Sequence, residues 1–298
     1  MESYQRSPFI YFLKDPKSMK YQSATTHNQF GIELINCNIP RGRIRFAIFD
    51  FDGTISLIRE GWQDIMIPMM VEILMATPDH ERLEETQQIV RKYVANTTGK
   101  QTIYQMIRLA EEVEKRGGIP QAPLEYKTKY HHLLMDRIIE RLRGLREGTI
   151  TPNEMAVPGS LNALHQITQA GVTCFLASGT DEKYVLEEAA LLGITPYFQG
   201  IYGAQDNYEN YSKRMVIQNI IKENHLNGPE LVAFGDGYVE IEDTKAVGGV
   251  AIGLATDEAR RAGIDLWKRE RLIASGADVI MPDFKPFPEL WQYLMPEL

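Results

Sequence analysis

The sequence has little cysteine, with only 2 in 298 residues. Two cysteines are too few for a disulfide framework or for a zinc site built on thiolates. Long apolar runs are also missing. The densest run, residues 65–76, is short and includes Pro68 and Glu72, so it is not expected to cross a membrane. Residues 1–13 lack a cationic start followed by a sustained apolar stretch, so no signal peptide is expected. These absences predict a soluble, cytoplasmic protein.

Positive charge is the scarcer sign in this chain. Lysine and arginine number 32 against 40 aspartates and glutamates, which gives a net charge of −8 with neutral histidines. A nucleic-acid-binding protein needs clustered cations to neutralise phosphates, so the acidic balance argues against such a partner. A small anionic substrate is not excluded, because a few local cations or a metal ion can reverse the field of one cleft.

Changes in sequence pattern divide the chain into an arm, a core and an insertion. Residues 1–40 are expected to form an irregular N-terminal arm with one short strand-like piece. Residues 41–57 contain a buried apolar strand, and residues 151–298 alternate strand and helix. That alternation predicts an α/β fold with a parallel sheet covered on both faces. Residues 58–150 show helical spacing of apolar residues in four segments, so we expect an all-α insertion.

Polar residues follow three of the predicted strands at their carboxyl ends. Ligands bind at this edge of a parallel sheet, so residues gathered there are candidates for a shared site. Each motif alone is typical of a turn, a helix cap or a solvated lysine. Their order within one alternating sheet favours the functional interpretation. The candidates are Asp50, Asp52, Gly53, Thr54, Ser178, Gly179, Asp236 and Glu240, together with Lys213 at the start of a predicted helix.

This arrangement resembles the haloacid dehalogenase-like hydrolase superfamily. Its motifs are matched by Asp50-x-Asp52-Gly53-Thr54, by Ser178, by Lys213, and by Gly235-Asp236 with Glu240. The resemblance covers about residues 41–57 and 151–298 and implies a Rossmann-like core. The insertion at residues 58–150 resembles the α-helical cap of the phosphoglycolate phosphatase and β-phosphoglucomutase branch. Glu240 is a departure, because many members carry aspartate there.

The resemblance implies phosphoryl transfer assisted by Mg²⁺, which suits carboxylate, phosphate and water oxygens. Asp50 would be the nucleophile that forms an aspartyl phosphate. Asp52 would act as general acid and then general base, a role that selects phosphatases and phosphomutases within the superfamily. The implied metal ligands are Asp50, the backbone carbonyl of Asp52, Asp236 and Glu240, and the implied phosphate-binding residues are Thr54, Ser178, Gly179 and Lys213.

The leading prediction is a phosphatase for a small phosphorylated metabolite, such as a sugar phosphate. A phosphomutase with the same core is the first alternative, and a non-catalytic binding protein on this fold is another. A phosphonate hydrolase would need a lysine in the cap that forms a Schiff base, for which Lys100 is the candidate. The polar turn around Lys100 is expected either to face the active site and bind substrate or to be a solvated loop. Arg59 and Trp62 are the next candidates for specificity. The sequence specifies neither the substrate nor the oligomeric state.

Overall fold

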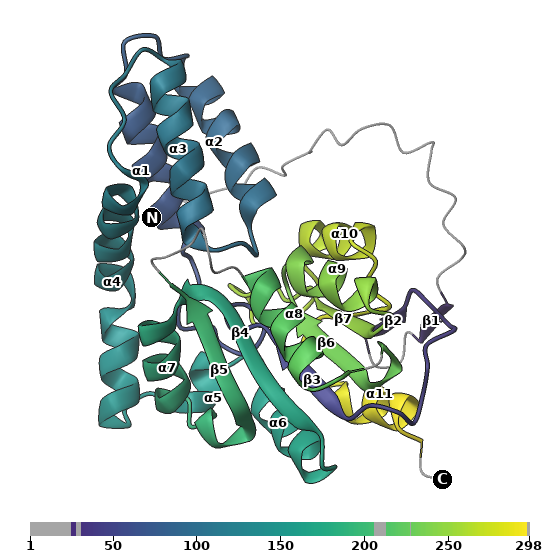
Figure 1. The fold of residues 1–298 in the computed structure, drawn as a ribbon. Coiled ribbons are helices and arrows are strands. Elements are labelled where there is room, and N and C mark those ends of the chain that lie inside the picture. Colours follow the sequence, from purple (N-terminus) through teal and green to yellow (C-terminus); the bar gives the residue numbers. More distant parts are fainter. Residues whose placement is uncertain (1–24, 28–30, 206–212, 227, 297–298) are drawn as a thin grey trace.

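The computed structural model describes residues 25–27, 31–205, 213–226 and 228–296 (Figure 1). Much of the predicted N-terminal arm, residues 1–24 and 28–30, lies outside the described residues. The strands are β1 (Thr25–His27), β2 (Ile32–Leu34), β3 (Phe46–Phe49), β4 (Thr173–Asp181), β5 (Phe198–Ala204), β6 (Leu231–Gly235), β7 (Val250–Leu254) and β8 (Val279–Met281). The α-helices are α1 (Gln63–Met75), α2 (Leu83–Thr97), α3 (Thr102–Lys115), α4 (Pro123–Glu147), α5 (Pro152–Met155), α6 (Ser160–Gln169), α7 (Glu182–Leu191), α8 (Lys213–Glu223), α9 (Tyr238–Ala246), α10 (Leu266–Ala274) and α11 (Phe287–Leu294).

These strands form one sheet in the order β1-β2-β8-β7-β6-β3-β4-β5. Neighbours from β8 to β5 are parallel, as the alternation of strand and helix predicts. The strand-like piece of the N-terminal arm is β2, which pairs antiparallel with β8, and β1 continues this antiparallel edge. The predicted α/β Rossmann-like core is therefore confirmed, with two antiparallel strands added at one edge.

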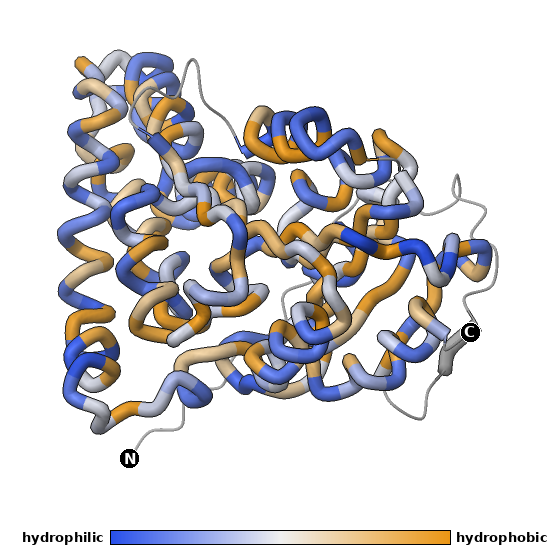
Figure 2. The backbone as a smooth tube through the Cα atoms, turned by 60° about the horizontal axis from the view of Figure 1, so that its bottom comes forward, coloured by the Kyte–Doolittle hydropathy of each residue, from blue (hydrophilic) through white to orange (hydrophobic). Residues whose placement is uncertain are grey.

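Alternate side chains of the buried strands contact helices on opposite faces of the sheet. Ile48 packs in a cluster with apolar residues of α8, whereas its neighbour Phe49 belongs to the cluster that includes α6, α7 and α11. At the other end of the sheet, α9 and α10 cover β7 and β8. Strands β6 and β7 are buried at every position, and apolar and polar stretches alternate along the chain (Figure 2). A sheet covered on both faces leaves its strand ends as the open place for a site.

The four helical segments expected within residues 58–150 are α1, α2, α3 and α4. They enter the chain between β3 and β4 and stand beside the sheet layer (Figure 1). Helix α4 packs on α1 and α3 and also on α7, so it connects the helical segment to the core. No helix in the described part of the chain is long and apolar enough to cross a membrane.

The two backbone segments that join the helices to the sheet layer run beside each other. The amide of Leu57 donates to the carbonyl of Met155 at 2.7 Å, and the amide of Val157 donates to the carbonyl of Ile55 at 2.8 Å. Entry and exit of the helical segment are thus held together. The two chain connections between the helices and the core therefore lie side by side.

Two elements differ from the sequence prediction. The strand predicted to end at Ala177 continues as β4 to Asp181, where it pairs with Ala204 of β5 after an irregularity in register, and α7 follows directly from Glu182. Ser178 therefore lies in extended backbone and not at a helix N-terminus. Helix α10 has no counterpart in the prediction. It begins where the carboxylate of Asp265 accepts a hydrogen bond from the amide of Lys268.

Candidate active site

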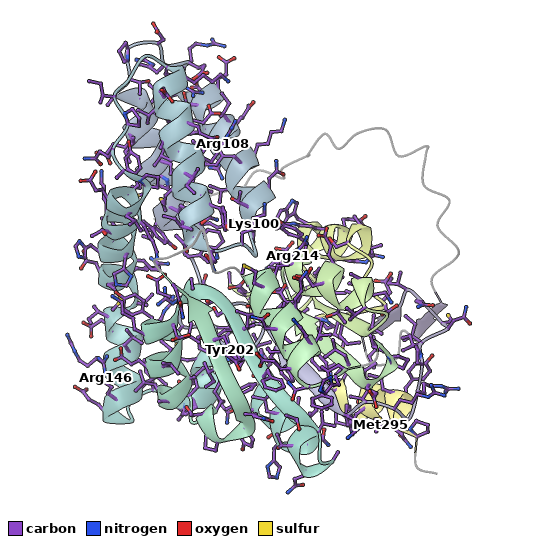
Figure 3. The ribbon with its side chains drawn as sticks, viewed as in Figure 1. Lys100, Arg108, Arg146, Tyr202, Arg214 and Met295 are labelled. Carbon is purple, nitrogen blue, oxygen red and sulfur yellow. The ribbon has the colours of Figure 1, made fainter. Side chains whose placement is uncertain are left out.

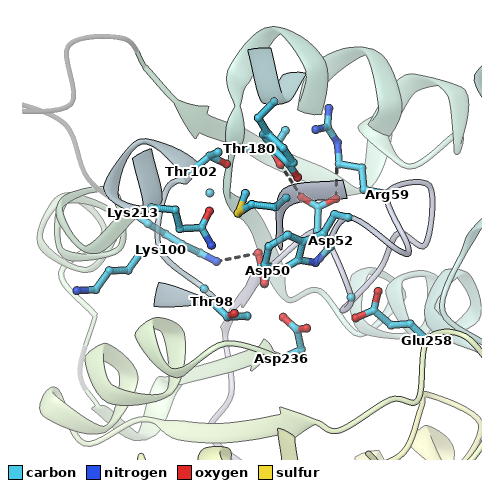
Figure 4. A pocket seen from close by; sticks show the side chains of 17 residues that line it. Asp50, Asp52, Arg59, Thr98, Lys100, Thr102, Thr180, Lys213, Asp236 and Glu258 are labelled. Atoms are coloured by element: carbon cyan, nitrogen blue, oxygen red, sulfur yellow. Dashed lines mark hydrogen bonds and ion pairs between the residues drawn. The ribbon is translucent and has the colours of Figure 1, made fainter. Parts of the chain in front are cut away.

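The central strand β3 lies between β4 and β6, and this order brings the predicted motifs together. Phe49 pairs with both Leu176 and Phe234, so the three strands end at the same edge. A cavity of about 100 Å³ opens there, between the strand ends and the helical segment. Its walls include Asp50, Asp52, Gly179, Lys213 and Asp236 from the sequence prediction (Figure 4).

Asp50 is buried at the base of the cavity. Its Oδ1 accepts hydrogen bonds from Nζ of Lys213 and from the amide of Phe51, both at 2.7 Å. Burial raises the pKa of Asp50 to about 7; Lys213 opposes this rise, and the charges of Asp236 and Asp52 add to it. A second cation near Asp50 and Asp236 would therefore favour the ionised form that a nucleophile requires.

Asp52 lies next to Asp50. One of its carboxylate oxygens accepts hydrogen bonds from the protein, and the other accepts none. Its Oδ2 accepts from Oγ1 of Thr180 at 2.7 Å and from Oγ of Ser178 at 3.5 Å. Its Oδ1 is buried without a hydrogen-bond partner, and Nε of Arg59 is 3.9 Å away. Burial raises the pKa of Asp52 to about 6, against the opposing charge of Arg59. A carboxyl group with this pKa can both give and take a proton near neutral pH.

Lys213 is held in place by Glu240. The two side chains form an ion pair, and Glu240 is fully buried beneath the site. Glu240 was expected to be a metal ligand, but it is not part of the cavity wall. Its carboxylate instead compensates the charge of the lysine that contacts Asp50. The additional carboxylate in the wall is Glu258, which the sequence interpretation missed.

Thr54 and Ser178 support the site from below its surface. Both are buried, and neither lines the cavity. Thr54 was expected to bind phosphate through its hydroxyl, but Oγ1 accepts the amide hydrogen of Asp236 at 3.0 Å. Ser178 accepts the amide hydrogen of Thr180 at 3.0 Å. Each hydroxyl therefore fixes a loop or strand end that does face the cavity.

Gly53 allows the aspartate turn to approach Asp236. Its φ is +74°, which is the left-handed region that glycine adopts without strain. A Cβ atom at this position would lie 2.3 Å from Oδ2 of Asp236 and 3.0 Å from Oε1 of Glu258. Only glycine fits against these two carboxylates.

One lysine binds both of these carboxylates. Nζ of Lys268 lies 2.7 Å from Oδ2 of Asp236 and 2.5 Å from Oε1 of Glu258. Lys268 comes from α10 and is buried. The sequence offered one signal for this residue, the capping aspartate Asp265 before an amphipathic stretch, which was not used.

The helical segment supplies the wall opposite the strand ends. Trp62, Gln105 and Tyr130 line the cavity there, together with Arg59 from the connecting segment. The predicted polar turn at 96–101 also reaches the site, and it lies where the helices meet the core (Figure 3).

Lys100 belongs to this wall, but its ammonium group points away from Asp50 (Figure 4). Nζ lies 5.9 and 6.0 Å from the ring centres of Tyr104 and Tyr238. The backbone of the turn lies closer to the core than its lysine does, because a Cβ on Gly179 would be 2.9 Å from the carbonyl oxygen of Lys100.

The donor set fits a Mg²⁺ ion bound by few protein groups. Among the described residues, no group of three histidine, cysteine, aspartate or glutamate side chains is close enough to form a metal cage. Mg²⁺ does not need one, since it keeps several waters and takes one or two carboxylates. Asp50 and Asp236 line the same cavity, and the charge of Asp236 raises the pKa of Asp50. A divalent cation held by both offsets this repulsion.

Solved structures share the fold at low sequence identity. A predicted phosphoglycolate phosphatase from Haemophilus somnus has 15% identity and a TM-score of 0.56 over 83% of this chain and 98% of its own. A haloacid dehalogenase-like family protein from Streptococcus pneumoniae has 15% identity and a TM-score of 0.54 over 84% and 99%. A β-phosphoglucomutase from Clostridium difficile has 15% identity and a TM-score of 0.51 over 78% and 98%. A search of curated protein sequences found no significant match.

The sequence profile of the haloacid dehalogenase-like hydrolases matches residues 47–253, which is more than half of the chain. The matched segment contains Asp50, Ser178, Lys213 and Asp236, the residues on which the resemblance was based. The prediction of a hydrolase of this kind is thereby confirmed. The chain belongs to the haloacid dehalogenase-like hydrolase family.

Proposed function

We propose that this chain is a Mg²⁺-dependent phosphatase that hydrolyses a small phosphorylated metabolite through an aspartyl phosphate. The proposal rests on the pairing of two carboxylates in one cavity. Asp50 is bound by Lys213 at 2.7 Å, and Asp52 presents a buried oxygen that has no hydrogen-bond partner. A nucleophile beside an ammonium group and a second carboxyl group with a free oxygen are what the two half-reactions require.

In the first half-reaction, a carboxylate oxygen of Asp50 forms a bond to phosphorus as the bond from phosphorus to the leaving oxygen breaks. Lys213 balances the negative charge that gathers around the phosphoryl group. Asp52 gives its proton to the leaving oxygen, which departs as an alcohol. Gly179 lies in the cavity wall, and we expect its amide to donate to a phosphoryl oxygen.

In the second half-reaction, water attacks the phosphorus of the aspartyl phosphate. Asp52, now ionised, takes a proton from that water, and Asp50 leaves as a carboxylate with inorganic phosphate as the product. The hydrogen bond from Thr180 keeps Oδ2 of Asp52 in place, so Oδ1 is the oxygen that exchanges the proton.

Asp50, Asp236 and the backbone carbonyl of Asp52 are the groups that would hold Mg²⁺. When bound, the ion supplies positive charge that neutralises phosphate oxygens and screens the repulsion between them and Asp50. Glu240 is left out of this set because it is bound to Lys213 beneath the site.

We further propose that residues 58–150 are a cap that selects the leaving group. Most side chains on the cap side of the cavity are neutral, among them Trp62, Gln105 and Tyr130. The two cations there are Arg59 and Lys100. Arg59 already binds Glu188 through two nitrogens, and the ammonium group of Lys100 points away from Asp50. This lining suits an uncharged, hydroxyl-bearing leaving group, as in a sugar phosphate, better than one with a second anionic group.

A phosphomutase of the β-phosphoglucomutase type is the second candidate. Such an enzyme would keep the aspartyl phosphate long enough to pass it to another hydroxyl. The structural likeness to a β-phosphoglucomutase favours this candidate over a phosphonate hydrolase. The latter needs a cap lysine at the reacting carbon, and the ammonium of Lys100 points away from Asp50.

Phosphate release from a panel of sugar phosphates, nucleotides, phosphoglycolate and a phosphonate tests the proposal. We expect steady release from at least one sugar phosphate, loss of release with EDTA, and recovery with Mg²⁺. The Asp50→Asn variant should lower turnover by about 10³-fold or more, since an amide cannot attack phosphorus. Turnover that requires a bisphosphate activator would indicate the mutase, and turnover insensitive to EDTA would contradict the metal role.

A further inference from the structure

Asp236, Lys268 and Glu258 form an ion triad in which Lys268 and Glu258 have no part in the reaction described above. Its two carboxylates line the cavity, and its ammonium group lies behind them. Lys268 contacts Oδ2 of Asp236, which leaves Oδ1 for a cation in the cavity. The same lysine holds Oε1 of Glu258, so it occupies one oxygen on each carboxylate.

Two members of the triad, Glu258 and Lys268, lie beyond residue 253, where the match to the family ends. Gly53, within the first motif, packs against the two carboxylate oxygens that Lys268 binds. The triad is therefore built into the floor of the site and is not a solvated surface pair.

Without Lys268, the cavity would present four carboxylates from Asp50, Asp52, Asp236 and Glu258. Ca²⁺ takes six to eight oxygen ligands at flexible distances, so an acidic pocket of this kind would favour it. Mg²⁺ demands octahedral geometry and is satisfied by one or two carboxylates with waters. The number of carboxylate oxygens left open therefore affects which of the two ions binds better.

We propose that Lys268 is an internal cation that limits the carboxylate oxygens open to a divalent ion and thereby favours Mg²⁺ over Ca²⁺. The inference rests on the proposed metal-dependent function. Lys268 lowers the negative charge of the pocket by one and keeps Glu258 from joining the metal ligands.

Lys268 is held between its two partners by geometry. It is buried, and its Nζ lies 2.7 Å from Oδ2 of Asp236 and 2.5 Å from Oε1 of Glu258. One side chain of α10 therefore occupies an oxygen on each carboxylate.

Isothermal titration calorimetry with Mg²⁺ and with Ca²⁺ tests the proposal by a readout independent of turnover. Wild type should bind Mg²⁺, and Lys268→Met should bind both ions more tightly, with the larger gain for Ca²⁺. We expect the ratio of Ca²⁺ to Mg²⁺ affinity to rise by about tenfold or more, because Glu258 becomes an additional ligand. The double variant Lys268→Met/Glu258→Gln should return this ratio to near the wild-type value.

Lys245→Met is the matched control. Lys245 is also paired with a buried carboxylate, that of Asp278 at 2.8 Å, but it does not line the cavity. Removing its charge should leave the affinity ratio unchanged. If Lys268→Met does not fold, Glu258→Gln provides the test. Lys268 would then pair with Asp236 alone and compete more strongly with a metal ion for that carboxylate. The affinity for both Mg²⁺ and Ca²⁺ should therefore fall.

The outcomes separate this inference from the proposed function. If wild type binds Mg²⁺ and Lys268→Met has the same ratio of Ca²⁺ to Mg²⁺ affinity as wild type, the inference is overturned. The phosphatase proposal then still stands. Weaker binding of both ions by Lys268→Met also overturns it, since Lys268 would then only orient Asp236. Wild type that binds no divalent ion overturns both the inference and the metal role in the proposed function.

Discussion

Arg59 and Glu188 form a buried ion pair in which Nε and Nη2 of the arginine lie 3.1 and 2.6 Å from Oε1 of the glutamate. Arg59 belongs to the segment that leads into the helices, and Glu188 belongs to α7 of the core. The same guanidinium group lies 3.9 Å from Asp52. One ion pair therefore connects the start of the helical segment, the core and Asp52.

Removing one member of this pair should destabilise the protein strongly. Arg59→Met leaves Glu188 as an uncompensated buried charge, so the free energy of unfolding should fall by about 3–5 kcal/mol. The double variant Arg59→Met/Glu188→Met should recover most of this loss. Urea unfolding measures both effects. Arg146→Met is the control. Its pair with Glu187 likewise links residues 58–150 to α7, but it is exposed. It should cost no more than about 1 kcal/mol. A loss in Arg59→Met as small as in the control would contradict this prediction.

Asp52→Asn should separate the two half-reactions. An amide can donate a hydrogen bond to the leaving oxygen but cannot take a proton from water. Turnover should therefore fall by about 10²–10⁴-fold, and the aspartyl phosphate should accumulate with an activated substrate. Intact-mass measurement after brief exposure to p-nitrophenyl phosphate should show a larger phosphorylated fraction than in wild type. Asp50→Asn should show none. Unchanged turnover with every leaving group would make Asp52 a structural turn residue.

Alanine at Gly179 or Gly237 should hinder closure of the cap. A Cβ on Gly179 would lie 2.9 Å from the backbone oxygen of Lys100, and one on Gly237 would lie 3.0 Å from Cα of Gly99. Both contacts are with backbone of the cap turn, which must move outward. We expect kcat/KM for the best substrate to fall by about tenfold, equivalent to about 1.4 kcal/mol, with little change in Tm.

Hydrolysis of p-nitrophenyl phosphate should change less in both glycine variants, because this substrate offers the cap few groups to bind. An equal loss for both substrates would place the damage in the core. No loss for either would show that the turn does not need to approach the core.

Asp243→Asn should improve stability more at neutral pH than in acid. Burial raises the pKa of Asp243 to about 6, although Arg214 opposes the rise. The folded state therefore binds the proton more strongly than the unfolded state, whose pKa is near 3.8. Wild type loses this stabilisation as pH rises through the interval between the two values, and the variant does not.

The Tm difference between Asp243→Asn and wild type should thus increase by about 2–4 °C from pH 4 to pH 7. In a chain of this size, this increase corresponds to a change of about 1 kcal/mol in the free energy of unfolding. Comparing one variant at two pH values cancels the effect of its altered hydrogen bonds. Glu242→Gln is the control, because Glu242 binds the same arginine but is exposed. Parallel Tm curves for Asp243→Asn and wild type would rule out a raised pKa.

The sequence was informative where local pattern and strand order coincide. Each buried strand near the site is an apolar run that ends in a polar residue, so the convergence of Asp50 and Asp236 could be predicted before the structure. The roles of Thr54 and Glu240 could not, since a hydroxyl or carboxylate of the right type can bind the neighbouring protein group as readily as a ligand. The structure shows that Thr54 binds the amide of Asp236 and Glu240 binds Lys213.

Lys268 and Glu258 were beyond the reach of pattern analysis for a different reason. Neither belongs to a recognised motif, and although Asp265 and the amphipathic spacing after it are typical of a helix start, they do not indicate what the side chains of that helix contact. Their proximity to Asp236 depends on how the segment between β7 and β8 folds over the strand ends. Such a contact is a property of the tertiary structure alone.

The order of the strands also determines when the site can assemble during folding. Phe46 of β3 pairs with Leu231 of β6, and Leu34 of β2 pairs with Val279 of β8, so strands from the first part of the chain depend on partners from its last part. Helices α1 to α4 make mostly local contacts and can form early, whereas contacts between distant segments form slowly. Strand β3, which leads into Asp50, must remain unpaired on one side until β6 has been synthesised. A nascent chain can therefore possess folded helices α1 to α4 long before the edge that holds Asp50 and Asp236 is complete.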